Sequence, residues 1–81
     1  MTTAVILPKS GMGITEGTVV QWLKAEGDTV TQGDIVAEVE TAKAVLEIEA
    51  PVSGVLIKIL VAEGEDAEVN SEIAQIEQSN D

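Results

Sequence analysis

The sequence predicts an all-β protein: a flattened β-barrel or sandwich of two four-stranded antiparallel sheets, related by an approximate two-fold axis. Three observations support this fold class. Valine, isoleucine, leucine and alanine supply most of the apolar content, while phenylalanine and tyrosine are absent, and this composition favours strands. Several short segments alternate apolar with polar residues between turn residues. The chain also matches itself without gaps at an offset of 37 residues.

The internal match indicates two similar halves. Matched positions share residue type or apolar character, and include Gly17 with Gly54, Glu26-Gly27 with Glu63-Gly64, and Val39-Glu40 with Ile76-Glu77. Neither half is expected to bury its apolar face alone, so the two halves should pack together. The same offset relates Lys43 to Asn80, which predicts that both chain ends lie at the end of the sandwich opposite Lys43.

Eight strands are expected, each bounded by turns rich in glycine, proline, serine or aspartate. In order, residues 3–7 precede a turn at 8–13, residues 18–23 precede a turn at 26–28, and a short strand near Val30 precedes a turn at 32–34. Residues 35–40 and 45–49 flank Lys43 and lead into a turn at 51–54; residues 55–60, a short strand near Val69 and residues 73–77 follow. Residues 1–77 therefore form one domain, with 78–81 as a flexible tail or the start of a linker.

Residues 35–50 also allow a helical interpretation, because apolar residues in this segment recur at helical spacing and good helix formers lie between them. Two observations count against a helix. The matching segment of the second half, residues 73–77, is too short and too near the end of the sequence, and residues 45–49 alternate strictly. We therefore favour a hairpin over residues 35–49.

Lys43 lies between the two alternating runs and is expected at the tip of this hairpin. A lysine at a tight turn projects its amine away from both sheets, where another protein can enclose it and an attached arm can move. An exposed turn lysine is most often only a solvated charge, so the hairpin alone leaves that alternative open. The other lysines are weaker candidates, since Lys9 and Lys24 flank loops and Lys58 lies inside a strand.

The composition excludes several kinds of chemistry. The chain lacks cysteine and histidine, and with them disulfides, thiolate metal sites, a cysteine nucleophile and an imidazole base. Glu38, Glu40, Glu47 and Glu49 are not expected to hold a metal ion, because alternating strand positions do not converge on one point. The net charge of −11 repels nucleic acid and anionic membranes, so any partner surface is expected to be basic. Acidity could equally serve only to keep the isolated domain soluble and monomeric.

No apolar run approaches the ~20 residues of a membrane span. The first residues resemble neither a signal peptide nor a transit peptide, so a cytoplasmic location is expected.

Motifs along nearly the whole chain resemble, in order and spacing, those of lipoyl domains from dihydrolipoamide acyltransferases. They are Leu7-Pro8-Lys9-Ser10-Gly11-Met12, Thr15-Glu16-Gly17-Thr18-Val19, Trp22-Leu23, Glu26-Gly27-Asp28-Thr29-Val30, Gly33-Asp34 and Ala50-Pro51-Val52-Ser53-Gly54. The segment Glu40-Thr41-Ala42-Lys43-Ala44 is similar to the family's lipoyl-lysine turn, usually Glu-Thr-Asp-Lys-Ala. The resemblance implies a lipoyl domain of the biotinyl/lipoyl-attachment family, from the acyltransferase component of a 2-oxo acid (pyruvate or branched-chain) or acetoin dehydrogenase complex.

This resemblance implies a swinging-arm carrier that is not itself an enzyme. Lys43 would hold lipoic acid in amide linkage, accept an acyl group from a thiamine-diphosphate-dependent dehydrogenase and shuttle it between active sites. The other implied partners are a lipoate ligase or lipoyl/octanoyl transferase, the acyltransferase core and dihydrolipoamide dehydrogenase. The location would be the bacterial cytoplasm, or the mitochondrial matrix if the chain is a fragment of a eukaryotic protein.

The resemblance also implies two recognition elements. Glu40, Thr41, Ala42 and Ala44 would form the turn that is recognised around Lys43. The loop beside that turn, which would help the dehydrogenase to recognise its carrier, consists of Ser10, Gly11, Met12, Gly13 and Ile14. Ala42 replaces an aspartate that can bond turn amides, so the rigidity of the turn is open; we favour neutral drift over altered dehydrogenase preference.

Two alternatives share this architecture by resemblance. Biotin carboxyl carrier domains also place a lysine at a hairpin tip, but their lysine is usually flanked by methionines, where this chain has Ala42 and Ala44. A cofactor-free structural module of membrane-fusion adaptors is the other alternative, and nothing in the sequence suggests the long helical hairpin of those proteins.

Overall fold

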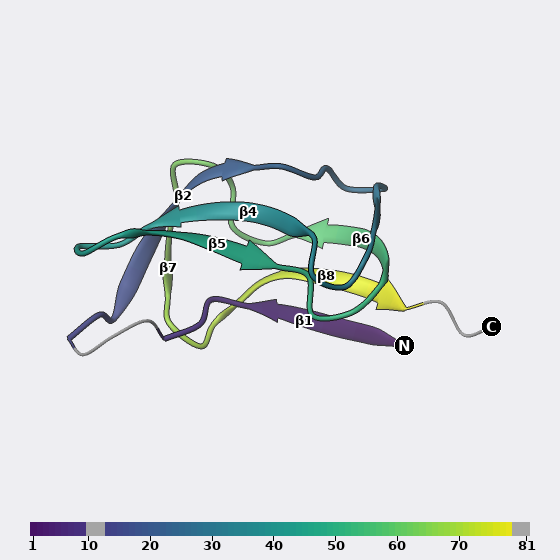
Figure 1. The fold of residues 1–81 in the computed structure, drawn as a ribbon, viewed down its shortest axis with the longest axis horizontal. Helices are drawn as coiled ribbons and strands as arrows, with labels where there is room; N and C mark the ends of the chain where they lie inside the picture. The colour runs from purple at the N-terminus through teal and green to yellow at the C-terminus, as the bar shows by residue number, and fades with distance from the viewer. Residues whose placement is uncertain (10–12, 79–81) are drawn as a thin grey trace.

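The computed structural model describes residues 1–9 and 13–78, and this part of the chain consists of strands and connections without a helix (Figure 1). The strands are β1 (Thr2–Ile6), β2 (Glu16–Trp22), β3 (Thr29–Val30), β4 (Ile35–Glu40), β5 (Val45–Glu49), β6 (Gly54–Ile59), β7 (Asp66–Glu68) and β8 (Glu72–Gln78). They form two four-stranded antiparallel sheets with the orders β1-β8-β6-β3 and β5-β4-β2-β7. The predicted fold class is confirmed, and the helical interpretation of residues 35–50 is wrong.

The last strand, β8, extends to Gln78, one residue past the predicted end of the domain. Within residues 1–9 and 13–78, no helix has the length and apolar character needed to cross a membrane.

The internal repeat relates the two sheets. An offset of 37 residues carries β2 to β6, β3 to β7 and β4 to β8, and one strand order becomes the other when β5 takes the place of β1. Hydrogen bonds repeat in the same way: Gly27 N donates to Leu56 O at 2.7 Å, and Gly64 N donates to Val19 O at 2.7 Å. Both glycines have positive φ, 95° and 86°, which residues with a Cβ rarely adopt.

The halves are also interlocked. The short strand β3 pairs with β6, and β7 pairs with β2, so each half contributes a strand to the sheet of the other half. Neither half can therefore complete a sheet from its own strands.

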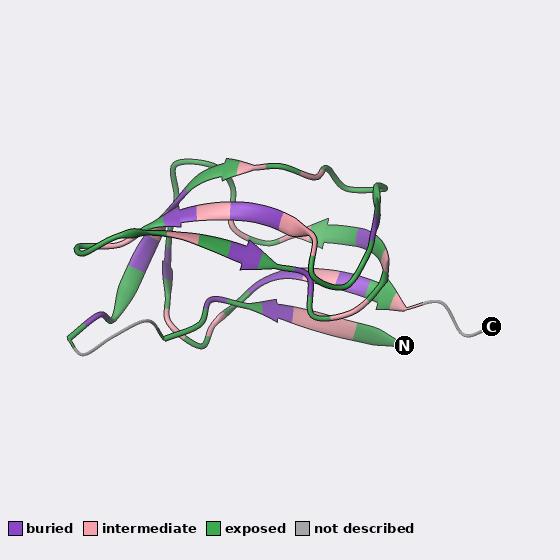
Figure 2. Cartoon of the chain, viewed as in Figure 1, coloured by how far each residue is buried: buried purple, intermediate pink, exposed green. Residues whose placement is uncertain are grey.

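The core lies between the two sheets and is built from aliphatic side chains (Figure 2). It consists of Val5, Leu7, Val19, Val30, Val36, Ala37, Val39, Ile48, Ala50, Leu56, Ala67, Ile73, Ala74 and Ile76. Trp22 packs against it, and its indole N–H donates to Val61 O at 2.8 Å, which satisfies the polar atom of this partly buried side chain. Burial of these side chains fixes strands β2, β4 and β5, from which the candidate site projects.

Four register irregularities interrupt the two-residue period of the strands. They lie at Val20 in β2, Val36 in β4, Ile57 in β6 and opposite Val5 and Ile6 in β8. At two of them, neighbouring side chains are both buried: Val36 with Ala37, and Ile73 with Ala74. Such bulges increase the local twist of a strand, which helps each sheet to curve around the core.

The β4–β5 turn lies at one end of the molecule's longest axis, and the N-terminus and the end of β8 lie at the other, as the repeat predicts (Figure 1). Gln78 N donates to Met1 O at 2.8 Å, so the end of β8 lies beside the start of β1. The Thr2 hydroxyl donates to the Glu77 carboxylate at 2.8 Å, and the Met1 amino group lies 3.5 Å from it. Both ends of the described chain are thus held together, away from Lys43.

Candidate functional site

Lys43 lies in the turn of the hairpin formed by β4 and β5, which projects at the end of the molecule where the connection into β2 also lies (Figure 1). Cross-strand pairs at the hairpin's outer part join Val39 with Leu46 and Glu40 with Val45. Val39 is fully buried, whereas Lys43 and the alanines on either side of it are exposed. The alternating pattern thus anchors the base of the hairpin in the core and presents the lysine at its exposed end.

The side chain of Thr41 closes the turn. Thr41 N donates to Ala44 O at 2.8 Å, and the Thr41 hydroxyl donates to the same oxygen at 2.9 Å. The hydroxyl oxygen also accepts hydrogen bonds from Ala44 N at 3.1 Å and from Lys43 N at 3.3 Å. Ala42 has only a methyl group and takes no such part. Sequence analysis named Thr41 as a turn residue, but not this set of bonds.

Gly17 of β2 lies against the base of the hairpin. A Cβ at this position would be 2.5 Å from Val39 Cγ1, 3.2 Å from Glu40 O and 3.4 Å from Thr41 Cγ2. The missing side chain therefore lets β4 approach β2 closely and leaves room for the Thr41 methyl group. Sequence analysis named Gly17 in the repeat and in a family motif but gave it no structural role, although a glycine inside a strand often signals such a close approach.

The predicted recognition loop lies partly outside the described residues, which exclude Ser10, Gly11 and Met12. Gly13 is exposed, with φ at 81°, while the Ile14 side chain is only 4% exposed. Ile14 is therefore an anchor for the end of the loop rather than a contact surface. The chain on both sides of the loop reaches the same end of the molecule as the β4–β5 turn (Figure 1). Recognition by this loop stays a prediction.

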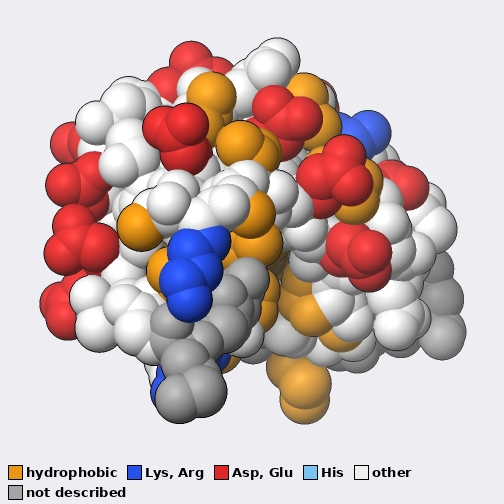
Figure 3. Space-filling model, turned by 60° about the vertical axis from the view of Figure 1, so that its left-hand side comes forward, with side chains coloured by type: hydrophobic (Ala, Val, Ile, Leu, Met, Phe, Trp, Pro, Cys, Tyr) orange, Lys and Arg blue, Asp and Glu red, His pale blue; other side chains and the backbone are white. Residues whose placement is uncertain are grey.

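An acidic face borders the hairpin. Glu38 of β4 lies directly opposite Glu47 of β5; Glu40 and Glu49 lie on either side of this pair. Like charges placed opposite each other do not stabilise a sheet, so the negative potential comes at some cost to the fold. Figure 3, which brings the end with the turn forward, shows acidic side chains on both flanks of this surface, with hydrophobic side chains between them. Among residues 1–9 and 13–78, no three histidine, cysteine, aspartate or glutamate side chains are grouped to hold a metal ion.

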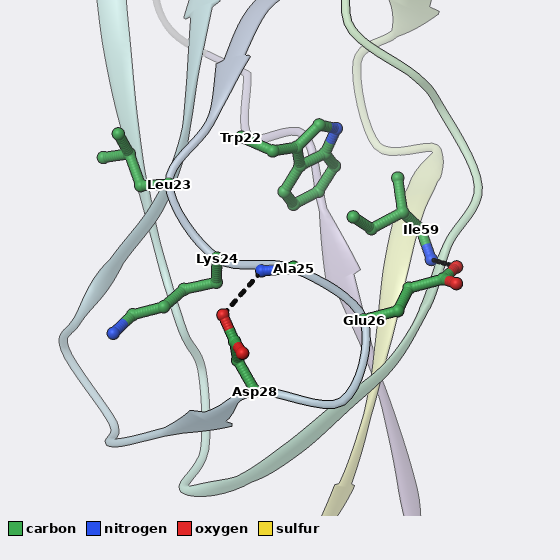
Figure 4. A pocket seen from close by; sticks show the side chains of 7 residues that line it. All are labelled: Trp22, Leu23, Lys24, Ala25, Glu26, Asp28 and Ile59. Carbon is green, nitrogen blue, oxygen red and sulfur yellow. Dashed lines mark hydrogen bonds between the residues drawn. The ribbon is translucent and has the colours of Figure 1, made fainter.

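A shallow hollow lies elsewhere, where the β2–β3 connection meets β6 (Figure 4). It is lined by Trp22, Leu23, Lys24, Ala25, Glu26, Asp28 and Ile59. Its two carboxylates are already used: Asp28 accepts from Ala25 N and Glu26 from Ile59 N, both at 2.8 Å. The β2–β3 connection runs toward the chain ends, so this hollow is separate from the lysine turn (Figure 1). We interpret its polar groups as ties that hold the connection to the sheet.

Comparison with known proteins gives matches over nearly the whole chain. Residues 3–76 match the family model described as "Biotin-requiring enzyme". The chain is 44% identical over 78 residues to the dihydrolipoyllysine-residue acetyltransferase component of the pyruvate dehydrogenase complex of Corynebacterium glutamicum, covering 96% of this chain and 12% of that protein. It is 42% identical over 82 residues to the pyruvate dehydrogenase E1 component subunit beta of Rhizobium meliloti, covering 100% of this chain and 18% of that protein.

A solved structure is similar as well. The lipoyl domain of the 2-oxoglutarate dehydrogenase complex from Azotobacter vinelandii matches with a TM-score of 0.73 and 25% sequence identity, over 95% of this chain and all of that one. The chain spans less than a fifth of the length of the two larger relatives, at 12% and 18%.

Proposed function

Because the chain belongs to the biotin- and lipoyl-attachment domain family, we propose that it is a lipoyl carrier domain whose Lys43 side chain holds lipoic acid in amide linkage. The position of Lys43 is the observation that carries this proposal. It lies exposed at the tip of a hairpin whose base is buried in the core, at the end of the molecule away from the chain ends. The flanking residues Ala42 and Ala44 favour lipoate over biotin.

The residues of the domain supply position rather than reactivity. When bound, lipoic acid would supply a dithiolane ring, whose disulfide is reduced to one thiol and one thioester as it accepts an acyl group that can then be passed on. The hairpin holds the attachment point clear of both sheets, and the small side chains of Ala42 and Ala44 leave the lysine accessible to a ligase. Amide formation removes the charge of the lysine. Tethering turns successive encounters between active sites into intramolecular ones, which raises the effective concentration of the group carried.

We infer that the domain serves a 2-oxo acid dehydrogenase complex, since the relatives and the solved domain named above come from such complexes. Its partners would be a lipoate ligase or lipoyl/octanoyl transferase, a thiamine-diphosphate-dependent dehydrogenase, an acyltransferase core and dihydrolipoamide dehydrogenase. The charge of −11 supports partner surfaces that are basic. The location that fits such a complex is the bacterial cytoplasm or the mitochondrial matrix.

Intact mass tests the attachment. After incubation with lipoate, ATP and a lipoate ligase, the parent protein should gain the mass of one lipoyl group, and Lys43→Arg should gain none. Lys9→Arg, Lys24→Arg and Lys58→Arg should be modified like the parent, because these lysines lie outside the hairpin turn. Modification of Lys43→Arg would contradict the assignment. Biotin ligase with biotin forms the parallel arm, and a parent modified by neither ligase would point to the cofactor-free module.

A second assay tests the loop. Removal of Gly11 and Met12 should slow reductive acylation by the dehydrogenase and leave ligation unchanged, because the larger enzyme covers more surface than the ligase. If both reactions slow equally while the fold is preserved, the loop has no separate role in recognition.

A further inference from the structure

We propose that the hydroxyl group of Thr41 is the positioning group of the lysine turn: it fixes the backbone at Lys43 and so aims the side chain that receives the cofactor. This inference rests on the proposed function and deepens it. Thr41 acts through the conformation of residues 42–44, to which its hydroxyl is hydrogen-bonded.

The backbone angles explain why the turn needs a side chain. Two-residue hairpin turns usually have positive φ at one or both central residues, because that conformation matches the twist of the flanking strands. Among the described residues other than glycine, positive φ occurs at Asn70, so Ala42 and Lys43 both have negative φ. Negative φ at both positions avoids steric strain but splays the strands that the turn connects.

The hydrogen bonds show how Thr41 compensates for this mismatch. One backbone bond crosses the turn, from Thr41 N to Ala44 O at 2.8 Å. The return bond, from Ala44 N, goes to the Thr41 hydroxyl at 3.1 Å, and the hydroxyl in turn donates to Ala44 O at 2.9 Å. The same oxygen accepts the longer bond from Lys43 N at 3.3 Å. One hydroxyl group therefore ties both Lys43 and Ala44 to the end of β4.

The Thr41 side chain is itself held in one orientation. Its methyl carbon would lie 3.4 Å from a Cβ at Gly17, so the methyl group lies over this glycine, and the residue is partly buried. A β-branched side chain has few χ1 choices, and here one γ atom packs against β2 while the other bonds the turn. Between residues 41 and 44, the neighbours of Lys43 other than Thr41 are alanines without hydrogen-bonding side-chain atoms.

Loss of the hydroxyl should lower the population of turns that a ligase can accept. Without it, the Ala44 amide loses its bond to the end of β4, and the turn samples other conformations. A ligase that binds only the competent conformation then has a KM raised in proportion to the lost population, by at most about tenfold if the hydroxyl contributes ~1.4 kcal/mol to the equilibrium between turn conformations. The value of kcat should change little, because the bound complex is the same.

Three variants test this. Thr41→Val removes the hydroxyl and keeps the shape, Thr41→Ser keeps the hydroxyl, and Thr2→Val removes a hydrogen-bonded threonine hydroxyl at the other end of the molecule. Steady-state ligation should show KM raised by more than about twofold and at most about tenfold for Thr41→Val, and within about twofold of the parent for Thr41→Ser and Thr2→Val. Hydrogen exchange at the Ala44 amide, measured by NMR, should be faster in Thr41→Val than in Thr41→Ser or the parent.

The outcomes separate the two proposals. A parent-like KM for Thr41→Val, or a Thr41→Ser variant as impaired as Thr41→Val, would overturn the positioning role. Unchanged exchange of the Ala44 amide in Thr41→Val would overturn it without reference to any ligase. If the parent is not modified at all, the proposed function fails, and the exchange of the Ala44 amide still decides whether the hydroxyl holds the turn.

Discussion

Lys43 differs from the other lysines in the element that holds it. Lys58 lies within β6 and pairs with Gln75 of β8, and Lys9 and Lys24 lie in connections between strands. Lys43 lies in the short turn that joins two long antiparallel neighbours, with an exposed alanine on each side. Its position along the chain, rather than its charge, therefore sets the direction in which its side chain extends.

Moving the lysine by one residue tests this directly. Exchange of Lys43 with Ala42, or with Ala44, keeps the composition and charge of the turn. Both exchanges should slow ligation by about tenfold or more, because the side chain then leaves the turn in another direction or from another face of the hairpin. Initial rates of lipoate attachment provide the measurement, and unchanged rates in both variants would mean that the ligase does not require this position.

At the opposite end of the molecule, Thr2 controls a titration. The hydrogen bond from the Thr2 hydroxyl, with a smaller contribution from the Met1 amino group, lowers the pKa of the Glu77 carboxyl from its ordinary value. A carboxyl with a lowered pKa in the folded state stabilises the fold at pH values above its ordinary pKa, and this contribution is lost as the pH falls through the folded pKa. Thr2→Val should therefore raise the pKa of Glu77 and reduce this acid-dependent loss of stability. An NMR titration of Glu77 checks it, and an equal pKa in parent and variant would contradict it.

At the scale of the strands, two glycines that the repeat relates should respond differently to substitution. A Cβ at Gly54 would collide with the backbone carbonyl of Glu77 in β8, whereas a Cβ at Gly17 would meet mainly the Val39 side chain at 2.5 Å. Gly54→Ala should cost about 3 kcal/mol or more and Gly17→Ala about 1 to 2 kcal/mol, because a side chain can yield more easily than a paired strand.

Thermal unfolding measures this difference, because a loss of 1 kcal/mol lowers the melting temperature of a domain of this size by about 5 °C. The Gly17→Ala protein, tested below its melting temperature, should also be ligated more slowly, because its hairpin is displaced. Greater destabilisation by Gly17→Ala than by Gly54→Ala would contradict the prediction that the backbone collision at Gly54 is the more costly one.

The strands that the sequence predicts best are those whose pattern is local. Residues 35–40 and 45–49 match β4 and β5 in their bounds, since alternation and the turn at Lys43 define both. β2 begins at Glu16 instead of residue 18, because Glu16 and Gly17 pair with Glu68 and Ala67 of β7. That pairing joins segments about fifty residues apart, and no local pattern in the sequence predicts it. The bulges cannot be predicted from a two-residue period either, because each of those in β4 and β8 places two buried residues next to each other in the sequence.

Part of the candidate site could likewise be predicted from the sequence, and part could not. The hairpin that presents Lys43 follows from alternation, which is a property of the sequence alone. The bonds of the Thr41 hydroxyl do not, because a threonine next to a turn has several backbone partners within reach, and the φ angles of residues 42 and 43 decide among them. The contribution of Gly17 depends on the spacing of β2 and β4, which is set only when the sheet forms.

At the scale of the whole molecule, the domain should tolerate large attachments at its ends. Met1 and Gln78 lie together at the end opposite the lysine turn (Figure 1). A folded protein fused after Gln78, or before Met1, should leave kcat/KM for ligation within about twofold of the parent, because the ligase approaches from the other end. The same protein inserted between Ala42 and Lys43 should abolish ligation. Kinetics of lipoate attachment to the three fusions provide the measurement, and a strong loss with either terminal fusion would contradict this arrangement.

The contact between Gln78 and Met1 occupies the symmetry-related place of the lysine turn. Gln78 lies 37 residues after Thr41, and β1 stands where β5 stands in the other sheet, so the bond from Gln78 N to Met1 O at 2.8 Å repeats the bond from Thr41 N to Ala44 O at 2.8 Å. The two ends of the molecule are thus equivalent in backbone geometry: a turn joins β4 and β5 at one end, and β8 pairs with β1 at the other. Lys43 therefore lies at one of two equivalent positions of the fold, and the first and last described residues meet at the other.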